Sequence, residues 1–135
     1  MRLLPIVLGA LIVTGCSGKR EMADAEGAVA RFHAAYNKGD FDAIAGEAAS
    51  NMQSEAVARE LPELLAAMSE RLGPYDYGAR SNVNVRFSAS GTQVRIAYHS
   101  RYRGGPAQEN FVFAKQDKVM RLAGYTVNAG AVLSR

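Results

Sequence analysis

The hydrophobic pattern of this 135-residue chain changes period once, at Gly73 and Pro74, and this change limits the possible folds more than any other feature. Before it, apolar residues recur every three or four positions, which predicts amphipathic helices. After it, apolar and polar residues alternate, which predicts strands. The connections between these strands are too short for a parallel crossover. We therefore expect an α+β fold, in which N-terminal helices pack on a curved antiparallel sheet of about four strands.

Three helices are expected before this point, over about residues 20–38, 41–49 and 57–72. Pro62 lies inside the third apolar stripe. A proline inside a helix costs about 3 kcal/mol unless it occupies the first turn, because it lacks an N–H group and its ring clashes with the preceding turn. We therefore expect either a kink at Pro62 or a helix that restarts there.

The last two strands have a specific expected register. A two-residue turn at 117–118 pairs Phe113 with Leu122 and puts Phe111 opposite Gly124. Simple alternation then places on one face Phe111, Phe113, Met120 and Leu122. The opposite face receives Val112, Ala114, Arg121, Ala123 and Tyr125.

The N-terminus has the layout of an export signal. Arg2 precedes an apolar run of eleven residues, 3–13, which is within the ~7–15 of a signal-peptide core and short of the ~20 that span a bilayer. The run leads into a Val-Thr-Gly-Cys motif ending at Cys16, which resembles the lipobox of bacterial lipoproteins. An ordinary secretory signal cut after Gly15 is the alternative. We expect removal of residues 1–15 and lipidation of Cys16.

Lipidation also explains the cysteine content of the chain. Cys16 is its only cysteine, and a free thiol in an oxidising compartment is open to oxidation or intermolecular pairing. The resemblance to lipoproteins implies acyl chains, such as palmitate, that hold the protein on a membrane. An aspartate after the cysteine retains many enteric lipoproteins in the inner membrane. Ser17 stands at that position here, so under the enteric rule the resemblance implies the periplasmic face of the outer membrane. Residues 16–22 are then a short tether, and residues 23–135 form a single domain.

Charge is divided unevenly along the chain. Residues 17–77 contain six basic and eleven acidic side chains, whereas residues 78–135 contain nine basic and two acidic ones. The asymmetry follows the division between helices and strands, so the expected sheet is the basic half of the domain.

Two segments resemble a known superfamily. Residues 36–44 look like the helix–turn–helix opening of nuclear transport factor two-like domains, and residues 111–125 are similar to the final hairpin of small bacterial lipoproteins in that superfamily. The resemblance spans most of residues 22–128. It implies a cone-shaped fold whose interior often holds a small apolar ligand. Many members carry a tryptophan near the start of the last strand, where this chain has Val119 and Met120. Some of these families have no assigned function, so the resemblance supports the fold more than an activity.

Most catalytic signatures are absent from the sequence. It contains no His-Glu-x-x-His or paired-cysteine metal motif, no P-loop or dinucleotide glycine pattern and no Gly-x-Ser-x-Gly elbow. We therefore expect no metal and no other cofactor. His33 is expected at the edge of the first apolar stripe, and His99 on the polar face of its strand. Because enzymes of the resembled superfamily use His, Asp and Tyr groups inside the cone, a cluster of His33, Asp40 and Tyr98 is a catalytic hypothesis.

Two binding regions are expected. A pocket between the helices and the sheet would have His33, Tyr98 and Tyr125 as its polar residues. The polar face of the sheet is a candidate interface, and its members are Arg95, Arg101, Arg121, Val112 and Ala123. That face could meet a second copy, an acidic envelope protein or anionic headgroups; the alternative is a solvated face that resists aggregation. Nucleic acid is not an expected partner, because no recognition motif is present.

Three functions are compatible with these features. The leading hypothesis is a non-catalytic, membrane-anchored envelope lipoprotein that binds a partner or a small ligand. The second is a small enzyme of the lyase or isomerase type that uses the cone pocket. The third is a structural spacer, which would have neither a pocket nor a well-formed interface.

Overall fold

The computed structural model describes residues 16–130, and the expected export segment, 1–15, lies outside the described residues. The helices are α1 (Cys16–Lys38), α2 (Phe41–Gly46), the short 3-10 helix η1 (Ser50–Met52) and α3 (Glu55–Leu72). The strands are β1 (Tyr75–Ser88), β2 (Gly91–Tyr102), β3 (Gly105–Gln116) and β4 (Val119–Asn128). The change from helix to strand falls at residues 73–74, where the hydrophobic period changes.

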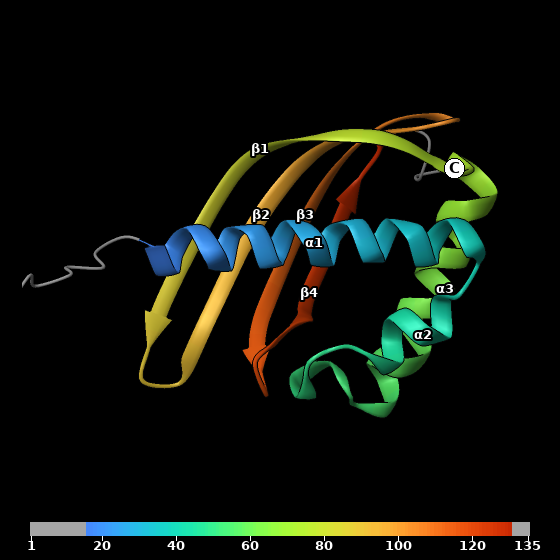
Figure 1. The fold of residues 1–135 in the computed structure, drawn as a ribbon. Coiled ribbons are helices and arrows are strands. Elements are labelled where there is room, and N and C mark those ends of the chain that lie inside the picture. The colour runs from blue at the N-terminus through green and yellow to red at the C-terminus, as the bar shows by residue number, and fades with distance from the viewer. Residues whose placement is uncertain (1–15, 131–135) are drawn as a thin grey trace, which may run out of the picture.

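The strands form one antiparallel sheet in the order β1-β2-β3-β4, which is curved and not closed into a barrel. Figure 1 shows α1 lying across one face of this sheet, with α2 and α3 together at one end. We call the face toward α1 the inner face and the opposite one the outer face. The predicted α+β fold, with helices packed on a curved four-stranded sheet, is confirmed. Within residues 16–130, no helix has the length and apolar character needed to cross a bilayer.

The first helix starts earlier than the sequence predicts, at Cys16 instead of about residue 20. A contact with the sheet secures this part of α1. Glu21 is buried, and Lys115 of β3 donates a 2.9 Å hydrogen bond to its carboxylate. The residues expected to form an extended tether, 16–22, therefore lie in the first turns of α1.

The third helix passes through Pro62 without restarting. It begins after Ser54, whose hydroxyl accepts a hydrogen bond from the N–H of Val57 and so caps the helix. Pro62 deprives the carbonyl of Ala58 of its helical partner. Because Ala58 is exposed, water can satisfy that carbonyl. A well-capped start and a solvent-facing break thus let the helix continue, so of the two expected alternatives, a kink or a restart, the restart is wrong.

The turn between β3 and β4 forms as the sequence predicts. Residues 117 and 118 have positive φ angles, 51° and 64°, which are typical of the two-residue turns that match the twist of a hairpin. Phe113 pairs with Leu122, in agreement with the expected register. Local turn chemistry therefore sets the start of this strand pair.

Beyond that pair, a β-bulge shifts the register. Val112 faces Gly124 and Phe111 faces Tyr125, so Ala123 is the extra residue on β4. A slip of one residue reverses the side on which every later side chain lies. Tyr125 therefore lies on the inner face. The expectations that Phe111 faces Gly124 and that Tyr125 points outward are both wrong.

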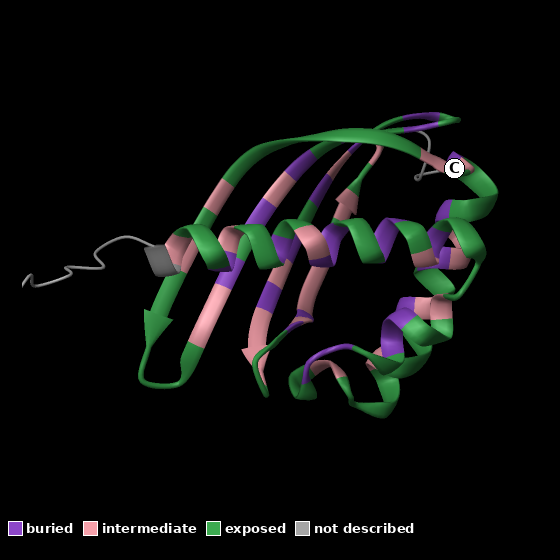
Figure 2. Cartoon of the chain, viewed as in Figure 1, coloured by how far each residue is buried: buried purple, intermediate pink, exposed green. Residues whose placement is uncertain are grey.

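The core lies between the inner face of the sheet and the helices α1, α2 and α3, and Figure 2 shows the buried segments of helices and sheet in purple. The ring of Phe32 on α1 packs edge-on against Phe111 of β3, with 5.0 Å between ring centroids. The chain after α2 covers part of the β4 edge, because the N–H of Ala49 donates a 2.8 Å hydrogen bond to the carbonyl of Leu122. In contrast, β1 is exposed along most of its length.

Candidate functional site

The most unusual group in the core is the carboxylate of Glu109, which projects from the inner face of β3 and has no exposed surface. His33 of α1 lies 2.9 Å away, from Nε2 to Oε1. Tyr102 donates a 2.9 Å hydrogen bond to Oε2, and Tyr125 donates a second hydrogen bond to the same oxygen. We call these four residues the Glu109 cluster. Side chains from α1, β2 and β4 thus converge on one carboxylate of β3.

The environment of Glu109 favours its ionised form. Burial alone would raise the pKa of Glu109, but the hydrogen bond and the charge of His33 outweigh it, with help from Ser100 and Tyr125, so the pKa is lowered. The hydroxyl of Ser100 is close enough to contribute, although its geometry is not that of a normal hydrogen bond. Burial and the negative charge of Glu109 raise the pKa values of Tyr102 and Tyr125 well above the ordinary 10.0. The cluster therefore contains a carboxylate and two protonated phenols.

His33 connects this cluster to the surface. Its ring stacks on that of Tyr75, with centroids 3.6 Å apart, and only 4% of the residue is exposed. It lines a pocket of about 310 Å³ together with Tyr98, Glu26 and Asp76. We call this hollow the His33 pocket. The boundary position expected for His33 is wrong, because the ring is buried against Glu109.

The residues of the catalytic hypothesis are not brought together. His33 and Tyr98 share the His33 pocket, whereas Asp40 lines a different hollow. Of the three expected pocket residues, Tyr125 contacts Glu109 from the other side and does not line the His33 pocket. Glu109 is the member that sequence reasoning missed. Its signal was a carboxylate in phase with the inward-facing Phe111 and Phe113.

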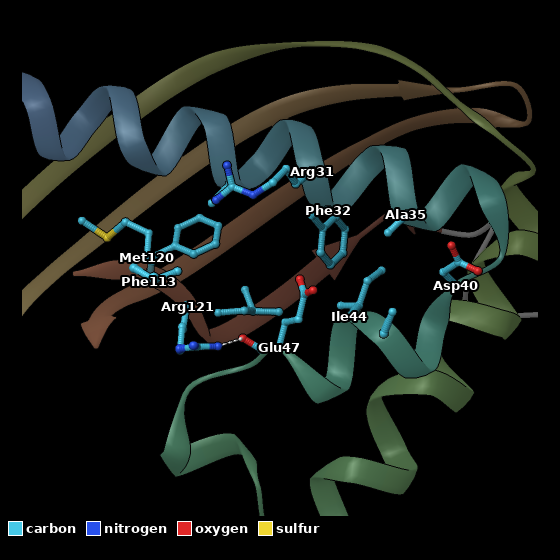
Figure 3. A pocket seen from close by; sticks show the side chains of 13 residues that line it. Arg31, Phe32, Ala35, Asp40, Ile44, Glu47, Phe113, Met120 and Arg121 are labelled. Carbon is cyan, nitrogen blue, oxygen red and sulfur yellow. Dashed lines mark hydrogen bonds between the residues drawn. The ribbon is translucent and has the colours of Figure 1, made fainter. Parts of the chain in front are cut away.

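A larger hollow of about 630 Å³ opens between α1, α2 and β4, and we call it the α1–α2 groove (Figure 3). Its floor is apolar and comes from both layers of the domain, with Phe32, Ile44, Phe113, Met120 and Leu122. Figure 3 shows the ring of Phe32 pointing from α1 toward α2. Helices and sheet thus leave a hollow above this part of the core, although each of these side chains is largely buried.

The rim of the groove is charged. Arg31 of α1, Arg121 of β4 and two carboxylates, Asp40 and Glu47, line it. The guanidinium of Arg121 donates a 3.3 Å hydrogen bond to the backbone carbonyl of Glu47 (Figure 3). Arg121 therefore reaches around the edge of the sheet toward α2, and it does not join the sheet face as an interface residue.

The other expected interface residues lie on or beside the outer face. Arg95 and Arg101 are exposed and alternate with buried residues along β2, as predicted. Val112 is half-buried and pairs with Arg95 in register. Ala123 is half-buried at the bulge of β4. Arg95 and Val112 line a hollow of about 460 Å³ in the outer face, to which Arg101 and Ala123 do not contribute.

Comparisons with known proteins do not assign this chain. No protein-family model matches the sequence, and no curated protein matches it. The candidate sites therefore stand on their geometry alone.

Proposed function

We propose that this protein is a lipid-anchored envelope lipoprotein whose domain is a binding module, and that its ligand site is the α1–α2 groove. One observation carries the proposal: an open groove of about 630 Å³ has an apolar floor and a charged rim. Its volume is within the range of small-molecule sites, ~300–1,000 Å³, and such sites combine an apolar lining with a few polar groups.

The composition of the groove favours an amphiphilic ligand. The floor side chains, such as Phe113 and Met120, can accept an apolar body, and burying it gains about 25 cal/mol per Å² of apolar surface. Arg31 is exposed at the rim and can pair with an anionic head group. A ligand with an apolar body and one acidic group therefore matches both parts of the site.

The groove can be tested by fluorescence titration of the full chain with anilinonaphthalene sulfonate, a probe with an apolar body and one anionic group. Ala43 is exposed on α2 and lines the groove, so Ala43→Trp should fill it and weaken probe binding at least tenfold. Ala58→Trp, on exposed helix surface outside the groove, is the matched control and should leave binding unchanged. Equal binding by both variants would contradict the proposal.

The head-group preference has its own measurement. Arg31→Gln should weaken binding of the sulfonate probe, because the paired charge is lost, while binding of the uncharged phenylnaphthylamine should change little. A similar loss for both probes would mean that Arg31 shapes the groove without selecting for an anion.

We place the protein at the periplasmic face of the outer membrane, held by lipid on Cys16. The support is the lipobox-like motif at the end of an apolar segment, together with the absence of other cysteines. In bacterial cells, Cys16→Ser should abolish incorporation of labelled palmitate and move the protein out of the membrane fraction. Retention of both label and membrane association would refute the anchor.

An enzyme of the lyase or isomerase type is the second candidate, because a carboxylate-paired histidine borders a pocket. Glu109 fixes the Nε2 side of His33, which is how buried carboxylates orient a histidine for proton transfer. Two features favour a structural role instead: Tyr75 covers one face of the ring, and little of His33 is exposed. Turnover that is lost in His33→Gln would support the enzyme over the binding module.

A further inference from the structure

The outer face of the sheet carries an unusual group of polar residues. Two neighbouring rows cross all four strands, and their register is Asn84–Arg95–Val112–Gly124 and Asn82–Ala97–Asn110–Thr126. With strands ~4.8 Å apart and alternate residues ~7 Å apart, the rows cover about 14 Å by 7 Å. They surround the hollow of about 460 Å³, which we call the outer-face hollow.

Three of the residues at this hollow, all asparagines, are of a type that is uncommon in strands. Asparagine is depleted in β-strands, because its short polar side chain competes with the backbone for hydrogen bonds. Here Asn82 and Asn84 of β1 and Asn110 of β3 lie on one face of the sheet, on either side of β2. Among residues 16–130, no hydrogen bond or ion pair involves their side chains or that of Arg95. Local violations of strand preference tend to occur at functional sites.

The β-bulge helps to form the hollow. It leaves Gly124 and Thr126 on the outer face while Tyr125 turns inward to Glu109. Bulges increase local twist and are common next to functional sites. Ala97 on β2 and Gly124 at the β4 end of the other row have little or no side chain, so the surface is lower at these two positions than at the polar residues beside them. A flat molecule can therefore approach the sheet backbone closely.

The charge of this face is positive. The two rows contain Arg95, and an adjacent row contains Arg86. The two rows and the row on either side of them, which lie within the described residues, contain no aspartate or glutamate. A guanidinium forms paired hydrogen bonds with a carboxylate. The surface is thus complementary to an anion, and a carboxylate is one anion that Arg95 can bind through two parallel hydrogen bonds.

We propose that the outer-face hollow binds an acidic oligosaccharide, with Arg95 on a sugar carboxylate and the asparagine amides on sugar hydroxyls. Each amide offers both a donor and an acceptor, and a pair of neighbouring hydroxyls requires both. The two rows contain a single basic residue, whereas attraction to a membrane surface depends on clusters of several lysines and arginines. A concave, amide-rich site with one arginine therefore fits a sugar acid better than a membrane surface. This site is independent of the α1–α2 groove.

The test is isothermal titration calorimetry of the full chain, kept in a mild non-ionic detergent, with trigalacturonic acid as the probe. We expect binding that Arg95→Gln and Asn110→Thr each weaken at least tenfold. Arg59→Gln removes an exposed arginine on α3, away from the hollow, and should leave the affinity unchanged. Ala43→Trp should also leave it unchanged, which separates this site from the groove. Circular dichroism confirms that each variant is folded.

Three further probes separate charge from sugar recognition. The methyl ester of trigalacturonic acid keeps the hydroxyls without the charge, and it should bind at least tenfold more weakly. Polyglutamate and glycerophosphoglycerol carry negative charge without sugar-acid geometry, and neither should compete. The proposal is overturned if trigalacturonic acid does not bind, if Arg95→Gln binds it normally, or if either non-sugar anion competes equally. It is also overturned if Arg95→Gln converts a dimer into a monomer, since a second copy would then cover this face.

Discussion

The inner and outer faces of the same sheet contain polar side chains in opposite situations. On the inner face, the carboxylate of Glu109 is fully buried, and donors from His33, Tyr102 and Tyr125 surround it. On the outer face, three asparagines and Arg95 surround a hollow and have no partner among residues 16–130. The first group is satisfied by the fold itself, whereas the second remains available to a ligand.

This difference shows how the two groups should respond to mutation. A buried charge is tolerated only when its partners are in place, so any loss within the Glu109 cluster should appear as lost stability. Exposed polar side chains already have water as a partner, so replacing them should affect binding more than folding. Stability and binding measurements on matched variants can therefore separate the two faces.

The largest effect is expected from Glu109→Ala. The variant leaves His33 and two phenols in the core without their acceptor, and breaking a buried pair in this way costs about 3–5 kcal/mol. The measurement is the free energy of unfolding in guanidinium chloride. Glu60→Ala removes an exposed carboxylate from α3 and should change stability by less than about 0.5 kcal/mol. Equal effects of the two substitutions would show that Glu109 is not a structural charge.

The acid dependence of stability should come partly from the same carboxylate. Its pKa in the folded protein is below the ordinary 4.5, so the unfolded chain takes up this proton first as the pH falls. The stability that Glu109 contributes is therefore present above about pH 4.5 and is lost below it, as the pH falls through the lower folded pKa. Denaturant unfolding between pH 3 and pH 7 should show a shallower acid limb for Glu109→Gln than for the wild type. Parallel curves would assign the acid limb to other carboxylates.

The alkaline limb has the opposite sign and a different origin. The pKa values of Tyr102 and Tyr125 are raised by burial and by Glu109, and burial also raises that of Tyr36 to about 12. The unfolded phenols lose their protons first, near the ordinary 10.0, so their contribution is full below pH 10 and decreases above it. Loss of stability above pH 10 should accompany the phenolate absorbance of these three tyrosines, as an increase beyond that of the exposed Tyr77.

A smaller loss is expected from Tyr125→Phe, and it tests the bulge directly. The substitution removes one donor to a buried carboxylate, which costs about 1–3 kcal/mol. Tyr77→Phe is the control, because Tyr77 is 68% exposed. If β4 followed simple alternation, Tyr125 would face solvent and both substitutions would have the same small effect.

The β3–β4 hairpin contains one feature that the sequence predicts and one that it does not. The Phe113–Leu122 pair follows from a two-residue turn, and turn chemistry is local. The position of Tyr125 depends on the bulge, whose extra residue, Ala123, has no distinctive side chain. The shift has its reason in the tertiary structure, because it brings a phenol to Glu109. A local pattern could not reveal that benefit.

The candidate sites were predictable to different degrees. His33 and Tyr98 line one pocket, although the sequence placed His33 only at the edge of its apolar stripe. Asp40 follows α1 and lines the groove instead, since the bend between α1 and α2 directs it away from the cluster. Glu109 was missed because strand alternation was interpreted only through apolar residues. A carboxylate in an inward position is itself the signal of a buried pair.

The smallest effect is expected on the outer face and has the opposite sign. Asn110→Thr replaces a poor strand former with a good one at an exposed position, and it should raise the free energy of unfolding by up to about 1 kcal/mol. Gln93→Thr makes a similar change on the same face, outside the hollow, and is the control for stability without an effect on binding.

Two outcomes are decisive. If Asn110→Thr alone gains stability and also loses trigalacturonate binding, this asparagine is retained for recognition at the expense of strand preference. If Asn110→Thr instead lowers stability by more than about 0.5 kcal/mol, beyond the range of ordinary surface substitutions, the amide has a structural partner and the contrast between the two faces fails.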